Sequence, residues 1–333
     1  MAKYIGIDIT NEFISIYERG EGITLCERNC VCVDIVTREN LAVGNAALNL
    51  ANNTPGAVEL IDNLYTKESM NEELLSVIIS ELFYQIRVKN PVVIVAVKKD
   101  DKPKQIAALA NIIFEAGAKE VYTVDMLSAC SLGSGIMLSD KRCMMSCNIT
   151  DEYSVLGIVK GCINKGSKTF LFSFNKLLEV ITTFIKNEKN CTVSREDAKS
   201  LLEYSLLARP EFEYDGFAYS GIDIITGLPV SGKFASAEIK ELLSPFFDYL
   251  CENISSLYTH LPPEIKEEVE DKGILLCGNS NLSSMLNSYI EDKTKLHVTI
   301  STANENACLM GIGTVIENLN VFEVLLKGIG DEE

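Results

Sequence analysis

The chain has 333 residues, of which 47% are hydrophobic, so it has enough apolar material for two domains or for one duplicated domain. Its 30 Lys and Arg residues are outnumbered by 47 Asp and Glu residues, which gives a formal net charge of −17. A surface of this sign repels phosphate backbones and anionic lipid headgroups. We therefore expect no nucleic-acid partner, and membrane association is not favoured.

The cysteines predict a reducing compartment. They number eleven, an odd count, and no secretory signal precedes them. There is no Cys-x-x-Cys pair, and only His260 and His297 could supply an imidazole ligand. We therefore expect a cytoplasmic protein with free, buried cysteines, including Cys26, and no metal bound by thiolate or imidazole. No apolar run reaches the roughly 18 residues of a membrane-spanning helix.

The first part of the chain begins with β structure and continues as a βαβ unit. A loop-rich stretch is predicted from the end of the β structure to about Glu68, and Asn71 is a plausible cap for the helix that follows. The expected elements in chain order are three or four strands within 4–36, a helix over 71–89, a buried parallel strand at 92–97, a helix over 102–117 and a strand at 120–125.

The second part repeats the same kinds of element. Pro245 is expected to bend the long helix that starts at Ser236, or to begin a new helix. The expected elements in chain order are strands to about 173, helices over 176–189 and 195–209, a small β segment over 213–234, a helix from 236, a strand at 274–278, a helix over 282–292, a strand at 297–301 and a helix over 305–318.

One phrase occurs twice. "GIDITNEFISIY" at 6–17 and "CNITDEYSVLGIV" at 147–159 both read as a strand, a tight turn and a second strand. Each copy opens one half of the chain, and neither turn contains a glycine. The repeat indicates a duplicated fold whose two hairpin turns have the same design.

Several other stretches, together with this repeat, resemble the MreB family of bacterial actin homologues over nearly the whole chain. They are "AVGNAA" and "TPGAV" within 42–58, "EAGAKEVY" at 115–122, "ITGLPV" at 225–230, "LPPEIKEEVEDKGILLCG" at 261–278 and "GIGTVIENL" at 311–319. The resemblance implies an α/β, actin-like (ribonuclease H-like) duplicated fold. In that fold each half has a five-stranded mixed sheet flanked by helices, two small subdomains are added, and a cleft separates the halves.

The resemblance also implies domain boundaries. The first half is expected at 1–145 with a small subdomain at about 31–70, and the second half at 146–320 with a small subdomain at about 180–235. The tail at 321–333 is expected to pack on the first half, with "NVFEVLLKGIG" as a terminal helix.

The two turns depart from the family's nucleotide-binding pattern. The family's turns are rich in glycine because backbone N–H groups must approach the ATP phosphates closely. This chain keeps Gly6 and Asp8, but its first turn continues differently, as Thr10, Asn11, Glu12 and Phe13. The family's second turn reads Asp-Ile-Gly-Gly-Gly-Thr, and the residues found here are Asn148, Ile149, Thr150, Asp151, Glu152 and Tyr153.

Three further family elements are also altered. The catalytic Glu-Glu-Pro region corresponds to Asp125, Met126 and Leu127, and a methionine thioether cannot position an attacking water. A Gly-Asp pair is replaced by Phe174-Asn175, and the family's Glu-x-x-Lys against the adenosine is replaced by Lys199 and Leu202 at its ends. The later Gly-Gly-Gly survives only in part, as Gly278, Asn279 and Ser280, followed by Asn281.

These changes together predict a degenerate ATPase site. A carboxylate about 4 Å from a phosphate oxygen repels it by several kcal/mol at an effective dielectric constant near 20. We therefore expect no ATP hydrolysis and predict no cofactor, since ATP and magnesium are implied by the resemblance alone. An alternative interpretation makes Asp8, Asp151 and Glu152 a site for a hard cation. The preferred one leaves these carboxylates solvated or paired with Lys98 or Lys160.

Three functional hypotheses follow. The first is an MreB-like scaffold that forms filaments, or joins those of an MreB paralogue, in cell-shape or cell-wall organisation. It would act with cell-wall machinery and without ATP hydrolysis. The second is a working ATP-dependent filament ATPase in which Asp8, Asn11, Asp125 and Gly278 make the essential contacts. The third is a monomeric regulator that binds partners through its acidic surface.

Overall fold

The computed structural model describes residues 3–66, 69–207 and 217–328, apart from the side chains of 205–207, 236, 280–281 and 283–285. The strands are β1 (Tyr4–Ile9), β2 (Phe13–Glu18), β3 (Gly22–Arg28), β4 (Val31–Asp34), β5 (Asn40–Val43), β6 (Val58–Ile61), β7 (Val92–Val97), β8 (Glu120–Asp125), β9 (Cys143–Ile149), β10 (Ser154–Lys160), β11 (Ile163–Phe170), β12 (Cys191–Val193), β13 (Phe217–Asp223), β14 (Pro229–Phe234), β15 (Ile274–Gly278), β16 (Val298–Ile300) and β17 (Leu326–Gly328).

Helices fill most of the connections between these strands. They are α1 (Gly44–Asn53), α2 (Glu72–Gln85), α3 (Pro103–Glu115), α4 (Met126–Gly133), α5 (Phe174–Lys189), α6 (Arg195–Leu207), α7 (Ser236–Thr259), α8 (Pro263–Lys272), α9 (Ser280–Thr294), α10 (Ala307–Glu317) and α11 (Leu319–Phe322), with short 3₁₀ turns at Asn304–Asn306 and Glu323–Leu325.

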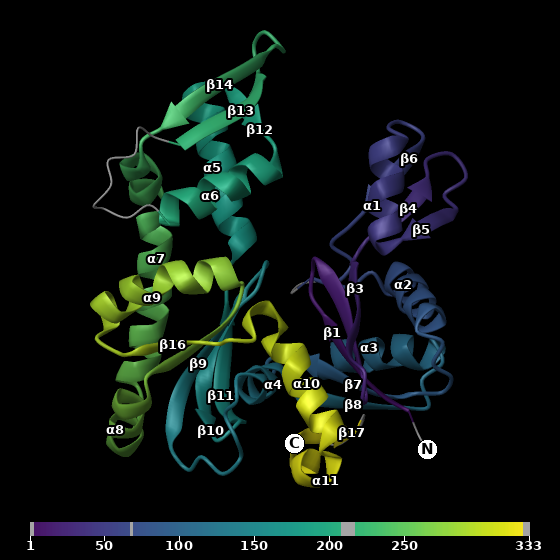
Figure 1. The fold of residues 1–333 in the computed structure, drawn as a ribbon, viewed down its shortest axis with the longest axis vertical. Coiled ribbons are helices and arrows are strands. Elements are labelled where there is room, and N and C mark those ends of the chain that lie inside the picture. The colour runs from purple at the N-terminus through teal and green to yellow at the C-terminus, as the bar shows by residue number, and fades with distance from the viewer. Residues whose placement is uncertain (1–2, 67–68, 208–216, 329–333) are drawn as a thin grey trace.

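Two mixed sheets organise the molecule (Figure 1). The first has six strands in the order β17-β8-β7-β1-β2-β3, and the second has five in the order β11-β10-β9-β15-β16. We call each sheet with its helices a body. A three-stranded sheet stands at the upper end of each body in Figure 1, β5-β4-β6 on the first and β12-β13-β14 on the second. This is the predicted actin-like α/β fold.

The βαβ unit of the first body is confirmed. All six residues of β7 are buried, and β7 pairs in parallel with β1 and β8. Its neighbour α2 begins where predicted, because the Asn71 side chain accepts a hydrogen bond from the Leu74 amide at 3.1 Å. Buried leucine, isoleucine and phenylalanine side chains from one face of α2 pack against the strands in a single core cluster.

Three expectations about the elements were wrong, and one of two alternatives for Pro245 was excluded. The stretch predicted as loop contains α1 as well as β5 and β6. Pro245 lies inside α7, so it does not begin a new helix, and a bend at this residue stays a prediction. The C-terminal tail is only briefly helical, because β17 then pairs antiparallel with β8 and gives the first sheet its sixth strand. Cys26 is exposed, whereas the other ten cysteines are buried, and all eleven are free.

Within the described residues, no single helix is long and apolar enough to span a bilayer. The bent pair 304–317 and 319–325, whose segments meet at 107°, meets the length and composition requirements only when the two are taken together.

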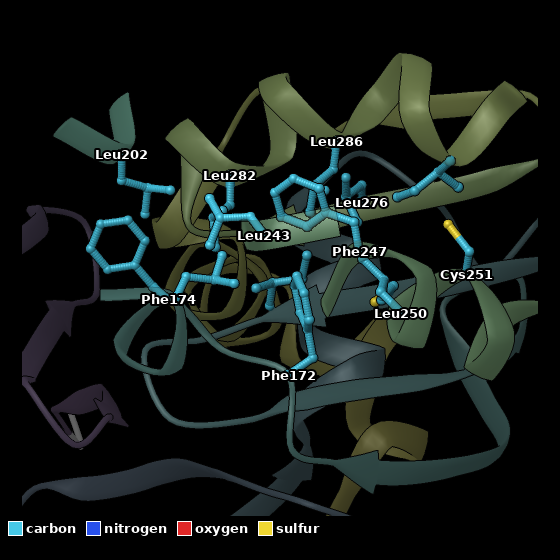
Figure 2. Close-up of a cluster of buried hydrophobic side chains, with 14 of the residues drawn as sticks. Phe172, Phe174, Leu202, Leu243, Phe247, Leu250, Cys251, Leu276, Leu282 and Leu286 are labelled. Atoms are coloured by element: carbon cyan, nitrogen blue, oxygen red, sulfur yellow. The ribbon is translucent and has the colours of Figure 1, made fainter. Parts of the chain in front are cut away.

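Apolar cores lie within each body and between them. The cluster of the second body joins α5, α6, α7 and α9 to its sheet, and Figure 2 shows Phe172, Phe174, Leu243 and Leu276 within it. Another cluster combines residues of both sheets with α4 and α10. The two bodies are therefore joined by buried apolar contacts and by the chain itself.

Helices α4 and α10 cross at two glycines. A Cβ atom added to Gly133 would stand 1.9 Å from the Ala307 carbonyl oxygen, and one added to Gly311 would stand 1.9 Å from the Ala129 carbonyl oxygen. Backbone cannot yield to such an overlap without moving a whole helix. The glycines therefore allow the two helices to touch along their backbones.

Gly311→Ala should destabilise the protein strongly. The added methyl group must separate α4 from α10, so we expect a loss of about 3 kcal/mol or more in the free energy of unfolding. Urea denaturation followed by circular dichroism measures the loss. Gly166→Ala is the matched control, because a Cβ there meets nothing within 4 Å. Equal effects of the two substitutions would contradict the role assigned to the crossing.

Candidate functional site

The turn between β1 and β2 closes on the side chain of its first residue. The Thr10 amide donates to the Phe13 carbonyl oxygen at 2.8 Å. The Phe13 amide donates to Thr10 Oγ1 at 2.9 Å, and the Thr10 hydroxyl lies 3.1 Å from the same Phe13 carbonyl. Asn29 braces the turn from outside, because its amide group donates to the Thr10 carbonyl oxygen at 2.9 Å. The Thr10 hydroxyl and the amides of Thr10 and Phe13 are thus paired within the turn.

The turn between β9 and β10 has the same construction. The Thr150 amide donates to the Tyr153 carbonyl oxygen at 2.9 Å, the Tyr153 amide donates to Thr150 Oγ1 at 3.2 Å, and the hydroxyl donates to the Tyr153 carbonyl oxygen at 2.8 Å. The repeated phrase in the sequence therefore encodes one structural unit, a hairpin turn closed by a threonine hydroxyl.

This construction explains the missing glycines. Residues 10–13 and 150–153 all lie in the described part of the chain, and none of them has a positive φ. A backbone of this shape accommodates any side chain. The amides of Phe13 and Tyr153 are directed to threonine oxygens, so they do not point outward as donors for a phosphate.

A small cavity lies between the two turns. Its volume is about 50 Å³, whereas pockets for small organic ligands usually measure roughly 300–1,000 Å³. It is lined by Asp8, Thr10, Met126, Asn148, Ile149, Thr150, Asp151, Gly278, Asn279, Glu305 and Cys308. The structure thus brings together residues predicted from both turns, the catalytic region and the third glycine element. The space left between them suits a few water molecules.

Asp8 is buried beneath this cavity. Its side chain is 8% exposed, and its Oδ1 atom has no hydrogen-bond partner among the described residues. Burial raises the pKa of the carboxyl to about 6, although a hydrogen bond with the Cys308 thiol acts in the opposite direction. The expectation that Asp8 would be solvated or paired with a lysine is therefore wrong. Lys98 instead pairs with Asp101, with 2.8 Å between Nζ and Oδ1.

Asp151 faces Glu12 from the opposite turn. Burial raises the pKa of Asp151 to about 6, and the charge of Glu12 and a hydrogen bond with it add to the increase. Arg195 and a hydrogen bond with Asn279 lower the same pKa. Two carboxyl groups share a hydrogen bond only while one of them is protonated, so at a pKa of about 6 this bond forms mainly below about pH 6, and above it two negative charges face each other. This part of the cleft is therefore chemically unsuited to another anion.

The catalytic region of the family is occupied by structural contacts here. Asp125 caps α4, since its Oδ1 accepts from the Ser128 amide at 2.8 Å and from the Ser128 hydroxyl at 2.9 Å, and its Oδ2 accepts from Asn164 Nδ2 at 3.1 Å. Burial is the main cause that raises its pKa. Met126 is buried in the core between the sheets. Neither side chain is free to activate a water molecule.

The positions aligned with the family's adenosine contacts belong to an apolar core. Phe174 and Leu202 are buried in the same cluster of the second body, and Figure 2 shows their side chains close together. Lys199 is exposed, and its Nζ lies 5.7 Å from the centroid of the Phe174 ring. Phe174 and Leu202 thus place buried apolar side chains where the family's pattern has glycine and lysine.

The third glycine element keeps one essential glycine. Gly278 has a φ of 94°, and a Cβ there would stand 1.9 Å from the Ile149 carbonyl oxygen. The Asn279 side chain caps α9 by accepting from the Leu282 amide at 3.3 Å. The side chains of the predicted site residues Ser280 and Asn281 lie outside the described part of the structure.

The remaining predicted site residue of the first turn makes a local contact. Asn11 donates through Nδ2 to Asn63 Oδ1 at 2.7 Å. Among the described residues, no group of three or more His, Cys, Asp or Glu side chains is placed to hold a metal ion. Asp8 and Asp151 both line the cavity, where Asp8 lies beside Cys308 and Asp151 faces Glu12.

Sequence reasoning missed several residues of this site. Arg28 and Arg195 both contact Glu12, and Glu305 and Cys308 line the cavity. Asn164, on β11, fixes Asp125. None of these five lies in a recognisable motif. Arg28 is the cross-strand neighbour of Phe13, and the other four reach the site from elements more distant in sequence. The only available signal was the need of several buried carboxylates for partners.

Comparison with known proteins gives consistent matches over nearly the whole chain. The family model described as MreB/Mbl protein matches residues 2–324. The cell shape-determining protein Mbl of Bacillus subtilis strain 168 is 21% identical over 323 residues, covering 96% of this chain and 97% of the relative. Cell shape-determining protein MreB of Escherichia coli K12 is 21% identical over 332 residues, covering 95% and 94%.

Solved structures agree on the fold. The crystal structure of MreB5 of Spiroplasma citri bound to AMPPNP has a TM-score of 0.86 at 21% identity, covering 96% of this chain and 97% of that one. A double helical filament of MamK has a TM-score of 0.76 at 13% identity, covering 95% and 99%. From the family match along residues 2–324, we conclude that the chain belongs to the MreB/Mbl family.

Proposed function

We propose that this chain is an MreB-type cytoskeletal protein that forms or joins filaments without hydrolysing ATP. It would act in the cytoplasm in cell-shape or cell-wall organisation, by self-association or by co-assembly with an MreB paralogue. The observation that carries the proposal is the pair of threonine-closed turns around a cavity of about 50 Å³.

The relatives support the two parts of this proposal differently. The names of the Bacillus and Escherichia relatives describe cell-shape determination, and the MamK structure is a filament. These support an assembling, shape-related role. The Spiroplasma MreB5 was solved with AMPPNP and with ADP. In this chain the corresponding turns carry carboxylates, and the amides of Phe13 and Tyr153 donate to threonine oxygens within the turns, which argues against the same ligand.

The chemistry of the site supports the absence of turnover. Hydrolysis needs a group that orients or deprotonates water beside the terminal phosphate. Asp125, the nearest carboxylate in the aligned region, is held by Ser128 and Asn164, and Met126 has no proton-accepting group. A triphosphate would also have to displace Asp151, Glu12 and their arginine contacts.

We expect assembly to be independent of ATP. Purified protein should sediment or scatter light to the same extent with and without millimolar ATP and magnesium, and it should release no phosphate above a blank. An MreB with glycine-rich turns serves as the positive control. Phosphate release that follows polymerisation would refute the proposal, and a protein that stays monomeric in every condition would favour the regulator.

Asp8→Asn should stabilise the protein at pH 7.5. The folded-state pKa of about 6 lies above the unfolded value of 3.8, so the folded state binds the proton more tightly, and stability falls as pH rises from about 4 to 6. With about 1.4 kcal/mol per pKa unit, removing the buried charge should gain at most roughly 3 kcal/mol at neutral pH. The gain should shrink at pH 5.5, where Asp8 is mostly protonated.

Urea denaturation at the two pH values measures this difference. Asp34→Asn is the control with the opposite sign, because hydrogen bonds from the Thr37 and Val36 amides lower the pKa of Asp34. That variant should lose stability at pH 7.5. If Asp8→Asn instead destabilises the protein at pH 7.5, a bound cation or donor compensates the Asp8 charge, and the cation hypothesis returns.

A further inference from the structure

Glu12 stands between two arginines that come from different bodies. One carboxylate oxygen accepts a hydrogen bond from Arg28 at the end of β3, in the first body. The other oxygen lies 3.8 Å from a guanidinium nitrogen of Arg195, at the start of α6 in the second body. A guanidinium recognises carboxylates and phosphates by the same planar array of donors. Glu12 is thus an anion held across the cleft.

Asp151 completes the arrangement from the second turn. It shares a hydrogen bond with Glu12 and also hydrogen-bonds with Asn279, the cap of α9. Arg195 is itself oriented by Asn175 at the start of α5, whose side-chain oxygen accepts from it. The carboxyl pair is therefore flanked by donors from both bodies, at the place where the two hairpin turns meet.

Two other polar contacts join the first body to the second. The Lys98 ammonium, which is 4% exposed, lies 4.6 Å from the centroid of the Tyr153 ring. Lys98 follows β7 in the first body and Tyr153 ends the second turn. The Thr169 hydroxyl on β11 donates to Asp100 of the first body at 2.9 Å. The two bodies thus make further polar contacts besides those of the carboxyl pair.

We propose that Glu12, Asp151 and Arg195 form a clasp that holds the two bodies together without a ligand, with the Glu12 carboxylate as the anion to which both arginines bind. A ligand closes two domains by binding the closed arrangement better than the open one. Here the bridging anion is part of the chain, so it is present at all times. The clasp would explain how the proposed function proceeds without a nucleotide, and its biological role rests on that proposed function.

Hydrogen exchange in the two turns tests the clasp. If Glu12 bridges the bodies, Glu12→Gln and Arg195→Gln should each speed the exchange of amides in peptides covering 10–15 and 148–155 by up to about fivefold, because opening becomes more frequent. Small-angle scattering should show a larger radius of gyration. The double variant should show less than the product of the two single effects, since both remove one contact.

Two substitutions of Asp151 provide a second test of the clasp. Asp151→Asn can still donate to Glu12 through its amide, so it should keep the slow exchange, whereas Asp151→Ala should lose it. The control for a lost carboxylate is Glu59→Gln. Glu59 contacts Arg38 beside β5 and β4, away from the cleft. Circular dichroism and thermal unfolding of each variant confirm that it is folded.

The outcomes separate the clasp from the proposed function. Exchange and radius of gyration that match the Glu59→Gln control in both Glu12→Gln and Arg195→Gln would refute the clasp alone. If instead the wild-type turns become protected only after ATP and magnesium are added, a nucleotide closes the cleft. In that case both the clasp and the nucleotide-independent function fail.

Discussion

The contact on which the rest of the structure depends is the crossing of α4 and α10 at Gly133 and Gly311. Each glycine faces a carbonyl oxygen of the other helix where a Cβ would have only 1.9 Å of room. Because the helices touch along their backbones, the surrounding residues of both sheets close into one apolar cluster. The separation of the two sheets is thereby set, and with it the gap across which the β1–β2 and β9–β10 turns face each other.

The side chains that lie between the two turns are determined by where the backbone hydrogen bonds of the turns are made. A tight turn must place its amides and carbonyls somewhere, and a glycine-rich turn leaves its amides to a ligand. Thr10 and Thr150 accept the amides of Phe13 and Tyr153 within their own turns, and none of the residues 10–13 and 150–153 has a positive φ. The positions after them then carry side chains, and Glu12 and Asp151 meet in the space that results.

Much of the fold was predictable because its signals are local or periodic. The buried strand β7, the cap at Asn71 and the doubled hairpin each show in a few consecutive residues. The helix α1 was missed because asparagines interrupt its short apolar face and only Gly44 and Ala47 are buried in it. The edge strand β17 was missed because three residues are too few to show alternation.

The site was predictable in its membership but not in its contacts. The residues that replace glycine were identifiable from their positions in the two turns, and most of them line the cavity. Their partners were not identifiable, since the contact between Glu12 and Arg195 joins residues that only the helix crossing brings together. The burial of Asp8 depends likewise on Cys308, which arrives from α10.

The two bodies are held together by the apolar cluster around α4 and α10 and by the polar contacts across the cleft, and these two sets of contacts differ in strength. The side chains of Glu12 and Arg195 are 22% and 48% exposed, and an ion pair in such a setting contributes only about 1 kcal/mol or less. One fully buried leucine or isoleucine contributes about 1.5–3 kcal/mol, and the cluster around α4 and α10 contains several. The apolar crossing therefore fixes the bodies permanently, whereas the cleft is held by polar contacts that thermal motion can break and remake. An interface of the second kind opens at little energetic cost, because each of its ion pairs is partly exposed and weak.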